Sequence, residues 1–150
     1  MTQPTLKLTI ELVPATSWGD NVRSRVSRTQ WDVLRKQVYA NANYHCECCE
    51  RPVRVLDCHE IWQYDELTRV QTLAGLQALC KACHQVKHIG RAAVMGHYVE
   101  ACQWLQHVNK MDNETMNAYL VEVFSVYQRR SQMVWTVNID WLNKADGDNK

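Results

Sequence analysis

The sequence predicts an α+β domain in which a bound metal ion fastens a β-hairpin to a helix. Three observations support this prediction: two C-x-x-C pairs, segments in which polar and apolar residues alternate, and segments with apolar residues at helical spacing. Hydrophobic residues make up 46% of the chain and charged residues 22%, a composition typical of a folded protein. The 150 residues fit one domain, or a small metal module with helical additions.

An N-terminal addition, residues 5–42, is expected to consist of a strand and a helix. Residues 5–13 alternate polar and apolar side chains, which predicts a half-buried strand. Ser27 or Thr29 can then cap a helix that runs to about residue 41.

The middle of the chain is expected to form a hairpin and a helix. Residues 53–64 are rich in β-branched and aromatic residues, and residues 72–79 form their return partner, although Gly75 weakens that strand. A helix begins at residue 81 and is interrupted or ended near Gly90.

A C-terminal addition, residues 97–142, is expected to contain two helices and a strand. Residues 97–108 and 113–130 carry apolar residues at helical spacing. Residues 134–142 alternate apolar and polar side chains, which predicts a final strand that can pair with the N-terminal one. These additions are expected to wrap the small central unit and to supply its missing core.

The cysteine pattern indicates a structural zinc site. Cys46 and Cys49 form one C-x-x-C pair, and Cys80 and Cys83 form another. A tight turn at each pair can aim both sulfurs at one point, and four thiolates can surround Zn²⁺ tetrahedrally. Cys48 is a spare that could replace Cys49. Because four thiolates leave no position open for water or substrate, this zinc is expected to support folding.

A second set of metal-binding side chains lies between and beside the cysteine pairs. His84 and His88 are four residues apart on the predicted helix, so both imidazoles share one face. His59 and Glu60 lie in the first strand of the predicted hairpin. A metal ion held between the hairpin and the helix would find ligands at these positions.

In this region the chain resembles the HNH, or ββα-metal, endonuclease superfamily. The resemblance covers about residues 44–92 and includes the first cysteine pair and the strand segment 56–61. Its most specific part is the block L-C-x-x-C-H-x-x-x-H at residues 79–88. It implies a zinc-stapled ββα-metal (HNH) core, with the remaining segments as additions to it.

The resemblance also implies an activity, the metal-dependent hydrolysis of DNA phosphodiester bonds. By alignment with the family, His59, His84 and His88 look like ligands of a catalytic divalent metal such as Mg²⁺ or Mn²⁺. Glu60 takes the place of the usual histidine general base, and the asparagine that positions this base in the family falls near Gly75.

Glu60 and Gly75 depart from the pattern of the family. An ionised carboxylate can act as a general base, and it could also bind the metal instead. In a shifted register, His59 would be the base and Asp57 the metal ligand. A fold that has lost catalysis and binds DNA or a protein partner is therefore a competing function.

The charge pattern leaves only local candidates for contacts with phosphate. The formal net charge of +1 is low for a strong nonspecific DNA binder. Lys87 and Arg91 lie beside the histidines, and Arg23 and Arg25 form a second cluster. We expect these four side chains to contact DNA, the expected partner.

The sequence contains no apolar run of about 18 residues, so no membrane span is expected. Its first residues lack a basic-then-apolar signal pattern, which favours a cytoplasmic location. Seven cysteines in a reducing compartment indicate metal binding before disulfides. Nothing in the sequence predicts the oligomeric state.

Overall fold

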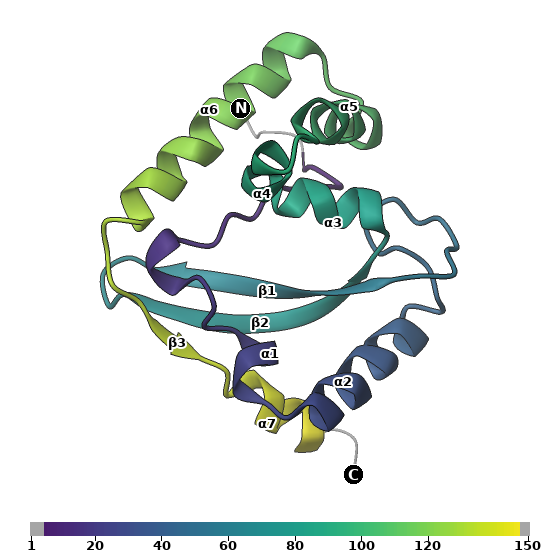
Figure 1. Cartoon of the computed structure of the whole chain (residues 1–150), viewed down its shortest axis with the longest axis vertical. Coiled ribbons are helices and arrows are strands. Elements are labelled where there is room, and N and C mark those ends of the chain that lie inside the picture. The colour runs from purple at the N-terminus through teal and green to yellow at the C-terminus, as the bar shows by residue number, and fades with distance from the viewer. Residues whose placement is uncertain (1–4, 148–150) are drawn as a thin grey trace.

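The computed structural model describes residues 5–147, an α+β fold built around one long hairpin (Figure 1). Strands β1 (Asp57–Asp65) and β2 (Val70–Leu79) pair antiparallel, and the short β3 (Thr136–Asn138) runs parallel to β2. The strand order is β1-β2-β3, so within the described chain the outer side of β1 is a free sheet edge. The predicted hairpin is confirmed, although β1 begins later than expected.

Helices cover both faces of the hairpin (Figure 1). One face carries four helices: α3 (Lys81–Lys87), α4 (Ile89–Val94), α5 (Tyr98–Asn109) and α6 (Asn113–Arg130). The other face carries three: α1 (Val22–Arg25), α2 (Arg28–Asn41) and α7 (Trp141–Gly147). A 3₁₀ turn, η1 (Ala15–Ser17), precedes α1.

Two separate apolar clusters form the core, one on each face of the hairpin. The first joins the N-terminal segment and helices α3–α6, and its buried members include Leu8, Leu79, Val86 and Leu105. The second is smaller and centres on Val22, Trp31 and Leu73. The first cluster also contains five buried cysteines, so a metal bound by some of their thiols would help to hold this face together.

Side chains cap the first turns of α2 and α6. The Ser27 hydroxyl accepts from the amide of Gln30, whose side chain returns the bond, so a capping box opens α2. Asp112 accepts from the amide of Thr115 at 2.7 Å and opens α6. No helix within residues 5–147 has both the length and the apolar character that crossing a bilayer requires.

The helix predicted from residue 81 is interrupted earlier than Gly90. The break falls at His88, whose φ of −110° and ψ of 48° end α3 and allow α4 to begin at Ile89. The amide of His88 still reaches the carbonyl of His84, at 3.3 Å. The spacing of the two histidines is therefore helical, although His88 itself sits at the bend.

The predicted N-terminal strand is wrong, and so is its pairing with a C-terminal strand. Residues 5–13 run extended with Leu8 and Ile10 buried, as alternation requires, but their hydrogen bonds go to helices. The amide of Leu8 donates to Asn109 Oδ1, that of Ile10 to the Tyr119 hydroxyl, and that of Glu11 to the carbonyl of Lys87. The alternation of polar and apolar residues indicates which side of a segment is buried. It does not determine which segment provides its hydrogen-bonding partners.

The C-terminal strand is shorter than predicted. Only residues 136–138 are β-structure, and they pair with β2. Trp141 begins α7, and its side chain and that of Leu142 pack on the smaller apolar cluster.

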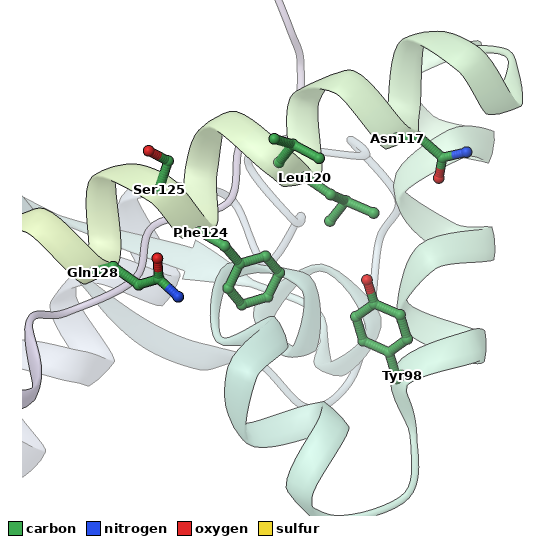
Figure 2. A pocket seen from close by; sticks show the side chains of 7 residues that line it. Tyr98, Asn117, Leu120, Phe124, Ser125 and Gln128 are labelled. Carbon is green, nitrogen blue, oxygen red and sulfur yellow. The ribbon is translucent and has the colours of Figure 1, made fainter.

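A shallow apolar recess lies between α5 and α6. Its lining includes Tyr98 from α5 and Leu120 and Phe124 from α6 (Figure 2). The recess has a volume of about 560 Å³ and carries no ionised side chain, so it lacks the groups that chemistry would need.

Candidate metal centres

The four predicted zinc ligands lie together. Cys46 and Cys49 come from the loop before β1, and Cys80 and Cys83 from the start of α3. Their sulfurs all lie within 4.8 Å of one another, with 3.8 Å between those of Cys49 and Cys80. Four thiols so placed could hold a metal ion such as zinc.

Each cysteine pair is shaped by its own turn. The amide of Cys49 points at the Cys46 sulfur, 3.5 Å away, and the amide of Cys83 points at the Cys80 sulfur, 3.4 Å away. The alternative use of Cys48 is not what the structure has, because its buried thiol lies outside the group. Burial raises the pKa of Cys48 to about 11, which keeps it a neutral thiol.

The thiols of the cluster share protons unevenly. A hydrogen bond with Cys83 is the main reason that the pKa of Cys46 falls to about 4, while the same contact raises the pKa of Cys83. The contact between these two thiols therefore favours one thiolate and one thiol. A bound divalent cation would end the sharing of protons among the thiols, because all four sulfurs can coordinate it as thiolates.

Two side chains from outside the C-x-x-C turns also contact the sulfurs. Arg51 points its Nε at the Cys49 sulfur, 3.4 Å away, and a terminal nitrogen at the Cys80 sulfur, 3.6 Å away. The Trp104 indole on α5 donates to the Cys83 sulfur at 3.2 Å, and the Arg51 guanidinium lies over its ring at 4.7 Å. Sequence reasoning missed both residues, because neither belongs to a cysteine motif.

We expect Arg51→Ala to weaken metal retention at the cysteine cluster by about 10- to 100-fold, the usual effect of removing an outer-shell hydrogen bond. The substitution removes two N–H···S contacts and the positive charge that offsets excess thiolate charge. The measurement is the rate of zinc transfer to a coloured chelator. Arg54→Ala, in the same loop and also exposed, serves as the control and should release zinc at the wild-type rate.

The three predicted histidine ligands also converge. His59 projects from β1, and His84 and His88 come from α3 and its end. Their ring centroids lie 5.5 Å (59–84), 5.3 Å (59–88) and 4.8 Å (84–88) apart, and one nitrogen of each lies within 4.8 Å of the others. Within residues 5–147 no fourth side chain joins this group, so a metal held by the three imidazoles would keep coordination positions for water or substrate.

Two carboxylates orient these imidazoles. Asp57 Oδ2 lies 2.9 Å from His84 Nδ1, and Glu11 Oε1 lies 3.3 Å from His59 Nε2. A carboxylate can only accept, so each contacted nitrogen carries the proton and the other nitrogen of the ring is left free for a metal. Sequence reasoning missed Glu11 because 47 residues separate it from His59 and no local pattern connects them.

Asp57 is therefore a partner of a histidine rather than a member of the convergent group. The shifted register would make Asp57 a metal ligand. In the structure its carboxylate instead binds His84 and Lys81. Burial opposes ionisation of Asp57, but hydrogen bonds from His84 and Lys81 outweigh it and hold its pKa at about 2. The carboxylate stays ionised and able to accept at any pH near neutral.

Burial favours the neutral form of two of the three imidazoles, those of His59 and His88. Burial is the main cause that lowers the pKa of His88 to about 3, and the neighbouring His84 and His59 lower it further. Burial also lowers the pKa of His59, against the opposing effect of Glu11. Neutral imidazole is the form that binds metal, so protons compete weakly at this centre.

We expect Asp57→Asn to weaken divalent-metal binding at the histidines by about 10- to 100-fold, since the amide cannot hold the His84 tautomer in the same way. Cobalt titration followed by visible absorption measures the affinity directly. Lys81→Met is the matched control, because it removes the other partner of Asp57 and leaves the carboxylate on His84. Equal losses in both variants would mean that the ion pair, and not the contact with His84, matters.

Glu60 lies outside the convergent group of imidazoles. Successive residues of a strand face opposite sides, and Glu60 Oε1 accepts from the amide of Val22 at 2.8 Å, at the start of α1. Burial raises the pKa of Glu60 above its ordinary value. Gly75 pairs with Ile61 across the hairpin, beside a bulge, and offers no side chain that could position a base.

The basic residues predicted to contact DNA differ in their exposure and in their partners within the fold. Arg23 and Arg91 are exposed and line the same cleft as the imidazoles. Arg25 forms a two-pronged ion pair with Asp20 (2.6 and 2.8 Å) and also donates to the carbonyl of Val137. Its guanidinium is therefore committed within the fold.

The expectation that Lys87 contacts phosphate is wrong. Its side chain is buried, 4% exposed, and its ammonium binds Glu11 and Thr9. A buried ammonium paired in this way cannot reach DNA without leaving an unpaired carboxylate behind. Lys87 instead ties α3 to the N-terminal segment and balances the charge of Glu11 beside His59.

The three histidines and Glu60 line one cleft, to which β1 contributes several residues. The cleft has a volume of about 990 Å³, and its lining includes His59, His84, His88, Glu60 and Arg91. It therefore brings together a place for a metal, a carboxylate and a cation that can face phosphate.

The chain matches no model of a protein family, no curated protein and no solved structure.

Proposed function

We propose that this chain is a metal-dependent endonuclease that hydrolyses DNA phosphodiester bonds at the histidine centre. The observation that carries the proposal is the convergence of three imidazoles in a cleft that also holds a carboxylate and arginines. A protein that needed only a scaffold would have no use for three imidazoles whose nitrogens lie within 4.8 Å of one another, one of them buried and two half-buried. The likeness of residues 44–92 to HNH nucleases supports the same proposal.

The two centres suit different tasks. Four thiols, three of them buried, form a closed site of the structural kind, and zinc is the metal that such soft ligands favour. Three imidazoles with room for water form a site of the catalytic kind. We therefore assign zinc to the cysteines and an exchangeable divalent metal, such as Mg²⁺ or Mn²⁺, to the histidines.

Different residues of the cleft would have different roles in hydrolysis. When bound, the divalent metal supplies a positive charge that stabilises the phosphate and the leaving oxygen. Glu60, which faces the other side of β1 from His59 but lines the same cleft, would accept the proton of the attacking water, since a partly buried carboxylate with a raised pKa is a better base than an exposed one. Arg23 and Arg91 bind neighbouring phosphates, and Asp57 and Glu11 hold the ligand imidazoles in their productive tautomers.

A second candidate is a catalytically degenerate module of the same fold that binds DNA or a protein partner. Two observations favour it: the Glu60 carboxylate is already engaged by the Val22 amide, and Gly75 has no side chain to position a base. The net charge of +1 argues for weak binding to duplex DNA in either case.

Cleavage assays separate the two candidates. The zinc-loaded protein is incubated with supercoiled plasmid and with single-stranded DNA, in Mg²⁺, Mn²⁺, Ni²⁺ or EDTA. We expect nicked or shortened products with at least one metal and none in EDTA. Binding without any cleavage, in every metal, would favour the module and count against the enzyme.

A further inference from the structure

The cleft that holds the histidines also carries an exposed tryptophan. Trp18 follows η1, and 68% of its surface is accessible, far more than is usual for so large an apolar side chain. Its indole Nε1 nevertheless donates to the carbonyl of Val13 at 2.9 Å, and the turn continues through Gly19 at a φ of 86°. The indole is therefore fixed in place while remaining open to solvent.

A second aromatic ring lies beside it. Tyr127 of α6 is nearly parallel to Trp18, with 18° between the ring planes and 6.5 Å between the centroids. Both rings line the same cleft as His59, His84 and His88. An aromatic surface that is already ordered loses little entropy when a planar ligand stacks on it.

The charges around the cleft are mixed. Three arginines line the cleft, Arg23, Arg91 and Arg130, together with four carboxylates, Glu11, Asp20, Glu60 and Glu122. A duplex is held mainly by many phosphate contacts from a basic surface, which this cleft does not offer. A single strand can instead gain affinity from stacking of its bases, because every base presents an aromatic face.

We propose that the cleft binds single-stranded nucleic acid, with one base stacked on Trp18 and the adjacent backbone at the histidine centre. This inference rests on the proposed function, since it names the substrate class of that same site. A flexible strand can place its phosphate between the imidazoles while its base reaches the aromatic wall. A regular duplex keeps its bases stacked inside and cannot use Trp18.

Fluorescence anisotropy tests this with the full-length, zinc-loaded protein in buffer without added divalent metal, so that no strand is cut. The probes are labelled oligothymidylate, oligouridylate and a hairpin duplex of equal length. We expect both single strands to bind at least about tenfold more tightly than the duplex, and Trp18→Ala to weaken them by about 5- to 100-fold, the effect of losing one stacked base. The two single strands then tell whether DNA or RNA is preferred.

Matched variants separate stacking from other effects. Trp18→Phe keeps an aromatic face and should retain most of the affinity, whereas Trp18→Leu keeps apolar bulk and should lose it. Tyr44→Ala removes an aromatic side chain of similar exposure (58%) that does not line the cleft, and should bind as the wild type does. If Trp18→Ala fails to fold, the contrast between the Phe and Leu variants carries the test.

The outcomes also distinguish this inference from the proposed function. Equal or tighter binding of the duplex, or Phe and Leu variants of equal affinity, would overturn the inference even if the protein cuts DNA. Binding of single strands that depends on Trp18, without cleavage in any metal, would uphold the inference and overturn the endonuclease.

Discussion

Replacing Cys83 with serine will leave the protein without its tightly bound zinc and largely unfolded at room temperature. Cys83 is fully buried in the larger apolar cluster, and its sulfur lies within 4.8 Å of the three other sulfurs. Serine oxygen is a poor replacement for a thiolate at zinc, so the site loses a ligand and the helix start loses its anchor. Zinc content by elemental analysis and thermal unfolding by circular dichroism measure the two effects.

The expected size of this effect follows from comparing two magnitudes. A structural zinc contributes about 10–16 kcal/mol in zinc-finger peptides, and a domain of this size is stable by about 5–15 kcal/mol in total. The first quantity matches or exceeds the second, so loss of the metal should unfold the chain rather than loosen it locally. A strong chelator should have the same effect on the wild type.

A cysteine outside the cluster provides the control. Cys58 lies in β1, half-buried, and does not belong to the group of four. Cys58→Ser should keep one tightly held zinc per chain and melt within a few degrees of the wild type. A Cys83→Ser protein that folds normally without zinc would show that the cluster does not support the fold.

The substitution His84→Ala will lower metal-dependent cleavage by more than about 100-fold while leaving the structural zinc in place. In the part of the chain that the structure describes, His84 provides one of three convergent nitrogens, and Asp57 fixes its ring through Nδ1. Losing an orienting contact alone costs about 10- to 100-fold, so losing the ligand should cost more. Initial rates of plasmid nicking measure the loss, and cobalt spectra report binding at the histidines.

The matched control for this variant is His97→Ala. His97 is exposed, caps no helix with its side chain and does not line the cleft. Its removal should change neither the rate of cleavage nor the content of metal. Cleavage that persists at the wild-type rate in a folded His84→Ala protein would exclude the histidine centre as the place of hydrolysis.

Features formed by residues only a few positions apart could be identified from the sequence. The capping residue Ser27, the two C-x-x-C pairs and the spacing of His84 and His88 each follow from local geometry, and the structure has them as expected. His59 was found through its place in the predicted hairpin strand. These features depend on turns, caps and helical periodicity, which are properties of short segments.

Other features depend on packing between distant segments, and pattern alone misjudged them. The alternation of residues 5–13 marked Leu8 and Ile10 as buried, yet the segment lies across helices instead of joining the sheet. Lys87 looked like a free surface cation beside the histidines, but the N-terminal segment buries it. A single sequence does not show which distant segment will cover a given side chain.

The sequence by itself determined the local framework of this protein: a hairpin, a helix that begins at a cysteine pair, and two sets of metal-binding residues at recognisable spacing. Only the tertiary structure decided the surroundings of those residues, including Glu11 on His59, Arg51 on the sulfurs, Glu60 at the start of α1 and Trp18 on the wall of the cleft. The physical reason is that hydrogen bonds and burial between segments far apart in the chain depend on how whole elements pack. Spacing within one element says nothing about that packing.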